Sequence, residues 1–189
     1  DVGVEMSGAH GRAASILNSR IHDKGAPRAS RVKSLVSINP TATKLVMSGV
    51  HPTQAYGHQA MGASRSQQLD MRKNVKGGTR FGGTSSCSAT VIAFTFGPTA
   101  DPLIRCPLEQ IGMWYQVWFA ATAADRHDSR FTWHQHLVKF LSNDSLGQTC
   151  GPVAATIQSL LEIGWKPARP DFWVVDDSTT VKLDTQPFT

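Results

Sequence analysis

Residues 44–76 contain two helix signals back to back, and this stretch constrains the fold more than any other. Pro52 suits the first turn of a helix, where a missing N–H costs nothing, and apolar residues follow it at helical spacing. Ser64 and Gln67 then form a capping-box pattern, in which each side chain satisfies a backbone N–H that the helix start leaves unpaired. Gly77 is a good left-handed helix end. The sequence therefore predicts a second helix between Ser64 and Gly77.

This second helix is more basic than apolar. Its apolar stripe is thin and consists of Leu69, Met71 and Val75. Its cations are Arg65, Arg72, Lys73 and Lys76. We expect these cations to carry no core contacts and to form a broad basic surface, which is suited to contacts with phosphate groups.

A glycine-rich loop follows at residues 77–88 and carries Arg80. The loop lacks the Gly-Lys-Ser/Thr of a P-loop and the GxGxxG spacing of a dinucleotide-binding turn. Two alternatives therefore stay open. Either Arg80 contacts phosphate, or the loop is a flexible connection that binds nothing.

The remaining pattern predicts a mainly α fold, a helical bundle with a small C-terminal β-hairpin. Further helices are expected at residues 13–21, 28–38, 41–47, 107–122, 131–141 and 153–163. Residues 89–96 are apolar but too few to distinguish a strand from a buried helix. The aromatic face of the helix at 107–122 is expected to lie in the core rather than to stack on bases.

The C-terminal part changes its period. Residues 172–175 and 180–183 are β-branched and aromatic runs around a polar turn, which is typical of a hairpin. Since a two-stranded hairpin is marginal alone, we expect it to pack on the last helix through Trp165 and Trp173. The chain is thus expected to contain a flexible segment (1–27), a basic helical region (28–80), a helical bundle (81–165) and a hairpin with its tail (166–189), with residues 166–170 as a link.

Charge is unevenly distributed along the chain. Up to Gly82 there are 12 Lys and Arg against 4 Asp and Glu, a balance of +8, whereas the remainder has 7 against 10, a balance of −3. A basic half of this kind favours a polyanionic partner, with a merely solvated surface as the alternative. No apolar run approaches the roughly 20 residues that span a bilayer, so no membrane partner is expected. The first residues carry neither Met nor a signal-peptide pattern, and we expect a fragment.

Cysteine usage is sparse, with three widely spaced residues and no CxxC motif. This usage favours an intracellular, reducing compartment, with nucleus and cytoplasm both open. Cys150 begins a Cys-Gly-Pro-Val-Ala-Ala run that resembles the start of papain-like bacteriocin-processing peptidases. No histidine follows it, so a structural cysteine is favoured over a nucleophile and no catalytic residue is predicted.

Two further patterns point to metal chemistry only weakly. His134 and His136 lie two positions apart, so on a helix they face different directions and share a metal poorly. Asp176 and Asp177 resemble the paired aspartates of polymerase palms. Asp-Asp-Ser-Thr is also ordinary turn chemistry, and no third carboxylate is evident on an adjacent strand. No metal ligand is therefore predicted.

Several short motifs together resemble the region just after the palm in LINE-like, non-LTR retroelement reverse transcriptases. They are SGVHPTQAYG at residues 48–57, MGAS at 61–64 and LDMR at 69–72. Further pieces of the resemblance are Asp101-Pro102, the helix through Trp114 and Trp118, Gly151-Pro152 with Leu160, Gly164-Trp165 and the final hairpin. The resemblance covers roughly residues 30–185.

The resemblance implies a thumb-like helical bundle that holds template–primer duplex in an RNA-directed DNA polymerase. The catalytic aspartates and their magnesium would belong to an upstream palm, so this chain would hold no cofactor and would not polymerise alone. Its phosphate contacts would be Arg65, Arg72, Lys73, Lys76 and Arg80. A non-catalytic helical accessory subunit of a larger protein assembly is the alternative, and a cysteine hydrolase using Cys150 is a third.

Overall fold

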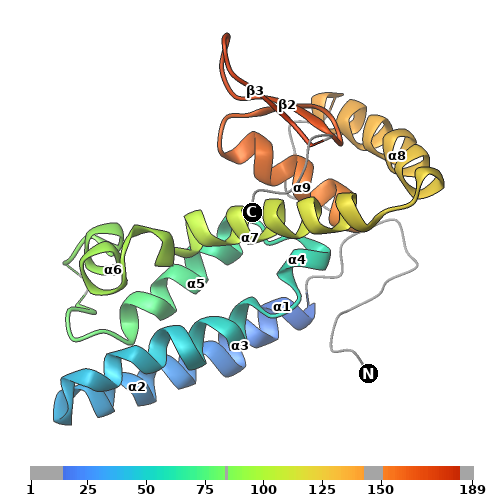
Figure 1. Cartoon of the computed structure of the whole chain (residues 1–189). Helices are drawn as coiled ribbons and strands as arrows, with labels where there is room; N and C mark the ends of the chain where they lie inside the picture. The colour runs from blue at the N-terminus through green and yellow to red at the C-terminus, as the bar shows by residue number, and fades with distance from the viewer. Residues whose placement is uncertain (1–14, 84, 143–150, 184–189) are drawn as a thin grey trace. The chain divides into compact units, whose positions relative to one another are not determined.

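The computed structural model describes residues 15–83, 85–142 and 151–183, which fall into two compact units (Figure 1). Unit 1 holds the described residues up to His58 and those from Ala63 to Cys106, and unit 2 holds Gln59–Gly62 and the described residues from Pro107 onward. The fold is mainly helical with a small antiparallel sheet, which confirms the predicted fold class. The two units divide the chain differently from the four regions expected above.

Unit 1 begins with an unbroken helical arm that runs beside a second, shorter one (Figure 1). The first arm consists of α1 (Ser15–Ser19), the π-helical segment η1 (Arg20–Gly25) and α2 (Ala26–Ile38). After η2 (Pro40–Thr43), the second arm consists of η3 (Val46–Val50) and α3 (His51–Ala55). The helix expected at residues 13–21 is present from Ser15 onward. It continues without a break into α2, so residues 15–25 are helical although they belong to the segment expected to be flexible.

Glycine allows the two arms to approach closely. Gly25 is buried, and a Cβ at this position would lie 2.9 Å from Gln54 Oε1 and 3.0 Å from Gln54 Cβ. Gln54 is itself fully buried, donates to the Met71 carbonyl at 3.1 Å and accepts from Asn74 Nδ2 at 3.0 Å. Hydrogen bonds among buried amides therefore connect the arms to the next long helix.

That helix is α5 (Arg65–Gly77), and its start is the predicted one. Ser64 has an extended backbone, and both hydrogen bonds of the capping box with Gln67 are present. The predicted left-handed end is wrong, because Gly77 is helical and the following Gly78 has a right-handed φ of −78°. Gly78 lies so close to the second arm that a Cβ at this position would be 2.7 Å from Val46 Cγ2, which explains why a glycine is suited to this position.

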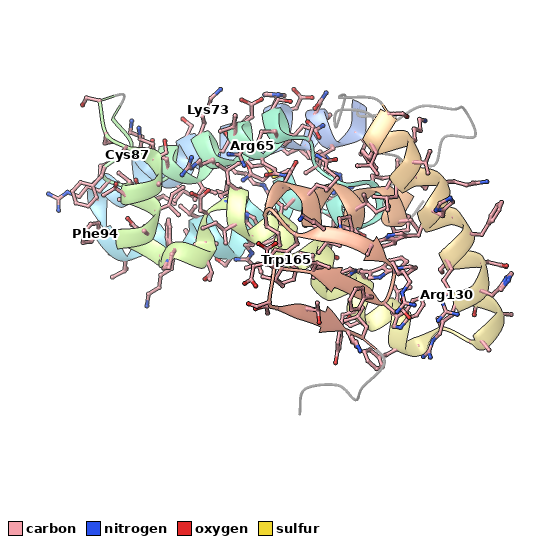
Figure 2. All side chains as sticks on the ribbon, turned by 90° about the horizontal axis from the view of Figure 1, so that it is seen from above. Arg65, Lys73, Cys87, Phe94, Arg130 and Trp165 are labelled. Atoms are coloured by element: carbon pink, nitrogen blue, oxygen red, sulfur yellow. The ribbon has the colours of Figure 1, made fainter. Side chains whose placement is uncertain are left out.

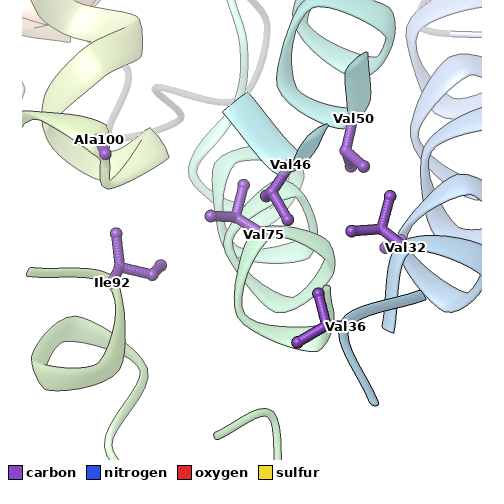
Figure 3. Close-up of a cluster of buried hydrophobic side chains, with 8 residues drawn as sticks. Val32, Val36, Val46, Val50, Val75, Ile92 and Ala100 are labelled. Atoms are coloured by element: carbon purple, nitrogen blue, oxygen red, sulfur yellow. The ribbon is translucent and has the colours of Figure 1, made fainter. Parts of the chain in front are cut away.

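The rest of unit 1 consists of α6 (Ser88–Phe96), η4 (Pro98–Ala100) and the first residues of α7 (Pro102–Ala120). α6 settles residues 89–96 as a helix. Unit 1 has two clusters of buried side chains, one of which contains Leu17, Ile21, Ala55, Ala63, Met71 and Cys106. The other is made mostly of valine (Figure 3), with Val32, Val36, Val46, Val50, Val75, Ile92, Ala29 and Ala100 all buried. These short side chains allow the helices to pack closely.

Unit 2 contains most of α7, together with α8 (Ala123–Ser142) and α9 (Gly151–Glu162); the short α4 (His58–Met61) spans the boundary between the units. Its core is aromatic, as the helix at 107–122 predicts. Trp114, Trp118 and Trp133 are each at most 3% exposed. The indole N–H of Trp114 donates to the Pro170 carbonyl and that of Trp133 to the Pro167 carbonyl, both at 3.0 Å.

The predicted hairpin is present, as β2 (Phe172–Val174) and β3 (Thr180–Lys182), but it belongs to a sheet of three strands. Residues 166–170 were expected to be a link, yet β1 (Lys166–Arg169) pairs antiparallel with β2. Proline is tolerated because β1 is an edge strand. The predicted packing of the hairpin on the last helix is confirmed, because Trp173 shares a buried cluster with Ile157 and Leu160 of α9 and its ring centroid lies 6.3 Å from that of Trp165.

Candidate nucleic-acid interface

Three of the five predicted phosphate contacts are exposed. Arg65 and Lys73 lie along α5 (Figure 2), and Arg80 lies in the loop that follows it. Lys73 Nζ lies 2.8 Å from Asp70 Oδ1, in an exposed i, i+3 ion pair. Such a surface pair is weak, so Asp70 does not prevent Lys73 from contacting a phosphate.

Arg72 is turned toward the protein instead. Its Nη2 lies 2.6 Å from Asp101 Oδ2, and the exposed fractions of the two side chains are 20% and 6%. Asp101 also accepts from the Leu103 N–H at 3.1 Å, at the start of α7. The expectation that Arg72 carries no core contacts is therefore wrong. The buried Asp101 carboxylate needs a cationic partner, and Arg72 supplies it instead of pointing into solvent.

Lys76 likewise has a structural contact. It is only 9% exposed, and its Nζ donates to the Ser86 carbonyl at 2.6 Å. This bond joins the end of α5 to the glycine-rich loop and gives the Ser86 carbonyl a charged hydrogen-bond donor. The prediction of a freely solvated Lys76 is wrong for that reason. With Arg72 and Lys76 both bonded within the protein, the basic face of α5 is narrower than expected.

Charge is nevertheless concentrated in unit 1. Its described residues include 12 Lys and Arg against 3 Asp, a balance of +9, whereas those of unit 2 include 6 Lys and Arg against 7 Asp and Glu, a balance of −1. Eight of the 12 cations are exposed, namely Lys24, Arg28, Arg31, Lys33, Lys44, Arg65, Lys73 and Arg80. Of the described carboxylates, only Asp70 pairs with one of these eight, so most of this charge faces solvent.

Unit 2 uses its three arginines within its own fold. The guanidinium carbons of Arg126 and Arg130 lie 5.4 and 5.6 Å from the ring centroid of Trp118. Arg130 and Arg169 also pair with Asp171, at 3.3 and 3.5 Å. These arginines stabilise the sheet and its supporting helices, whereas Lys139, Lys166 and Lys182 are exposed and have no carboxylate partner among the described residues.

The exposed cations of the first arm add to the predicted set. The sequence predicts a helix at residues 28–38, but the predicted phosphate contacts lie only on α5 and its loop. Arg28 and Arg31 are exposed on α2, and Lys24 precedes them on η1. The signal for them was the same local charge excess, with Val32 and Val36 marking the buried face between the cations.

The remaining candidate residues have structural explanations or lie outside the described residues. Asp176 accepts from the backbone N–H of Ser178 and of Thr179, and these bonds lower the pKa of its carboxyl, as the turn interpretation predicts. Burial lowers the pKa of His136. The part of the chain that the structure describes brings together no metal-binding group of three or more His, Cys, Asp or Glu. Cys150 lies outside it.

No protein-family model matches the sequence, and no curated protein and no solved structure is significantly similar to the chain. Among the described helices, none combines the length and the apolar character that a membrane span needs.

Proposed function

We propose that unit 1 binds nucleic-acid duplex without sequence preference, through phosphate contacts. The observation that carries this proposal is the balance of +9 among its described residues, with eight cations exposed. Binding of this kind draws its free energy from the release of counterions condensed on the phosphates. It needs exposed cations at several points of one surface rather than a preformed pocket.

The proposed contacts on α5 and its loop are Arg65, Lys73 and Arg80. Arg72 and Lys76 do not contact the phosphates in this proposal. They support the surface, because they hold the start of α7 and the glycine-rich loop against α5. The contacts position a duplex without reading its bases, since phosphates carry no sequence information.

The resemblance to the post-palm region of LINE-like reverse transcriptases supports the same function. We accordingly propose that the chain is the thumb-like, nucleic-acid-holding part of an RNA-directed DNA polymerase, that it does not catalyse polymerisation by itself, and that the magnesium would belong to a palm outside it. The engagement of Asp176 in its own turn fits a non-catalytic hairpin.

A salt titration tests the proposal. Fluorescence anisotropy with a labelled RNA–DNA hybrid gives the slope of log affinity against log salt, and about four phosphate contacts correspond to a slope of roughly −3 to −4. Replacing Arg65, Lys73 and Arg80 with Ala removes three exposed cations, so we expect the slope to flatten by about 2.7. Arg72 and Lys76 stay unchanged, because their removal would disturb the fold.

The matched control removes the same charge from unit 2, as Lys139, Lys166 and Lys182 replaced with Ala, all three of which are exposed. We expect this variant to keep the wild-type slope. Equal flattening in both variants, or none in either, would contradict the proposal, because affinity would then follow net charge or some other property rather than the surface of unit 1.

A helical accessory subunit of a larger assembly is the second candidate, and one observation favours it. On α8, Phe131, Val138 and Leu141 are 64%, 50% and 75% exposed. Their spacing places them on one side of the helix, where they form an apolar strip suited to a protein partner. An unchanged salt slope in the unit 1 variant would move this candidate ahead of nucleic-acid binding.

A further inference from the structure

The line where the first arm meets α3 gathers an aromatic ring and several cations on one side of unit 1. The guanidinium carbon of Arg20 lies 4.5 Å from the centroid of the Tyr56 ring. Eight residues further along the arm, Arg28 Nη1 donates to Thr53 Oγ1 at 2.7 Å and lies 3.5 Å from the Gly49 carbonyl. We call this line, with Arg20, Lys24, Arg28, Thr53 and Tyr56, the α3 seam.

The α3 seam is distinct from the exposed face of α5. On the first arm, Asn18 accepts from Gln67 of α5 at 2.7 Å, and His22 lies 3.8 Å from Asp70 of α5. Arg20 and Arg28 instead contact the second arm. The first arm thus presents one side to α5 and another to α3, and the cations of the α3 seam lie on the latter.

Helical spacing aligns the cations of the seam. Arg20, Lys24 and Arg28 are four residues apart, close to one turn of the continuous helical arm formed by η1 and α2. Lys24 is exposed between the two arginines, and Arg31 continues the same side one turn later. The described residues provide no ion-pair partner for Lys24 or Arg31, so both charges stay available to an anion.

Tyr56 adds a feature that duplex binding does not need. The residue is 54% exposed although Arg20 lies over its ring. The guanidinium fixes the ring and leaves much of it accessible to solvent. An exposed ring beside a row of cations is the combination with which proteins bind single strands, because a base stacks on the ring while the cations follow the phosphates.

We propose that the α3 seam binds single-stranded nucleic acid, with Tyr56 stacking on a base and Lys24, Arg28 and Arg31 contacting successive phosphates. This assignment goes beyond duplex binding by α5 and does not depend on it. It gives unit 1 two surfaces for nucleic acid, one for paired and one for unpaired strands.

The first test measures the ring. Anisotropy with a fluorescein-labelled oligothymidylate of roughly 12 nucleotides compares the full chain with Tyr56→Ala, which we expect to bind about fivefold more weakly or worse. Tyr56→Phe keeps the ring and should bind within about twofold of wild type. Phe94→Ala is the matched control, because Phe94 is 89% exposed in the same unit on α6 (Figure 2) and should leave the affinity unchanged. Equal affinity for wild type and Tyr56→Ala would overturn the proposal.

The second test measures the cations and does not rely on Tyr56. Replacing Lys24 and Arg31 with Ala should flatten the salt slope for the oligothymidylate by about 1.4, since each phosphate contact of a single strand contributes about 0.7. Lys33→Ala with Lys139→Ala removes the same charge from exposed positions outside the seam and should leave the slope unchanged. Equal slopes for the two double variants would overturn the proposal. The variant without Lys24 and Arg31 should keep the wild-type salt slope for the RNA–DNA hybrid. This result would distinguish the single-strand surface from the duplex contacts proposed for α5.

Discussion

The two units bury different kinds of side chain. Unit 1 packs valines and small residues in one cluster and aliphatic side chains such as Ile21 and Met71 in another, and it also buries amides such as Gln54 and Gln68. Unit 2 buries large indole rings, and all five tryptophans of the chain lie in it. A buried aromatic side chain removes far more apolar surface from water than a valine does. Per buried residue, the hydrophobic contribution to stability is therefore larger in unit 2.

The two units also differ in whether their cations have partners within the protein. Arg126 and Arg130 of unit 2 lie over Trp118, and Arg130 also pairs with Asp171. In unit 1 most exposed cations have no carboxylate partner among the described residues, Lys73 being the exception. Cations that stabilise a fold are occupied, whereas solvated cations are available to a polyanion. This difference supports the proposal that unit 1 is the part of the chain that binds a polyanion.

The largest expected effect separates the stability of the two units. Trp133→Ala should lower the free energy of unfolding of unit 2 by about 3–5 kcal/mol, because it opens a large cavity and leaves the Pro167 carbonyl without its donor. Chemical denaturation followed by tryptophan fluorescence measures this change. The fluorescence reports on unit 2 alone, since unit 1 contains no tryptophan.

Phe131→Ala is the matched control on the same helix. Phe131 is 64% exposed, so its removal should change the free energy of unfolding by less than about 0.5 kcal/mol. Binding of the RNA–DNA hybrid should persist in Trp133→Ala at temperatures where unit 2 is loosened. Loss of binding in parallel with the tryptophan fluorescence would show that the units do not behave separately.

Local signals predicted much of this architecture. The capping box at Ser64 and the aromatic face around Trp114 depend on neighbours within one helix, and both are present as predicted. β1 was missed because its pairing with β2 depends on residues elsewhere in the chain, while its own composition, with Pro167, is typical of a link. A proline is tolerated on an edge strand, but the local sequence does not show that the strand will lie at an edge.

The candidate interface was predicted less well, because a cation's role depends on contacts distant in sequence. Nothing near Arg72 in the sequence indicates its pairing with Asp101, 29 positions later. Lys76 is similar, since its acceptor is the carbonyl of Ser86 across a glycine-rich loop. Charge counts locate the basic unit, whereas only the folded structure distinguishes structural cations from solvated ones.

The next largest effect tests that distinction within unit 1. Arg72→Ala leaves the Asp101 carboxylate buried without its partner, so we expect α5 and the start of α7 to be destabilised by about 2–4 kcal/mol. Amide hydrogen exchange in these two segments measures the change. Arg65→Ala, on an exposed position of the same helix, should shift exchange by less than about 0.5 kcal/mol. A stable Arg72→Ala variant with a flatter salt slope would mean that Arg72 contacts phosphate after all.

The smallest effect concerns the helix that supports the proposed duplex contacts. Ser64→Ala removes the side chain that caps the Gln67 N–H, so we expect α5 to lose about 1 kcal/mol. Hydrogen exchange should quicken first in the opening turn of α5, and the salt slope for the hybrid should not change, because no charge is removed. Ser30→Ala is the matched control, an exposed serine inside α2 where alanine is neutral or slightly stabilising. If Ser64→Ala flattened the salt slope while Ser30→Ala did not, the serine itself would contact the nucleic acid. Exposed polar groups, and not cations alone, would then distinguish the surface of unit 1 from that of unit 2.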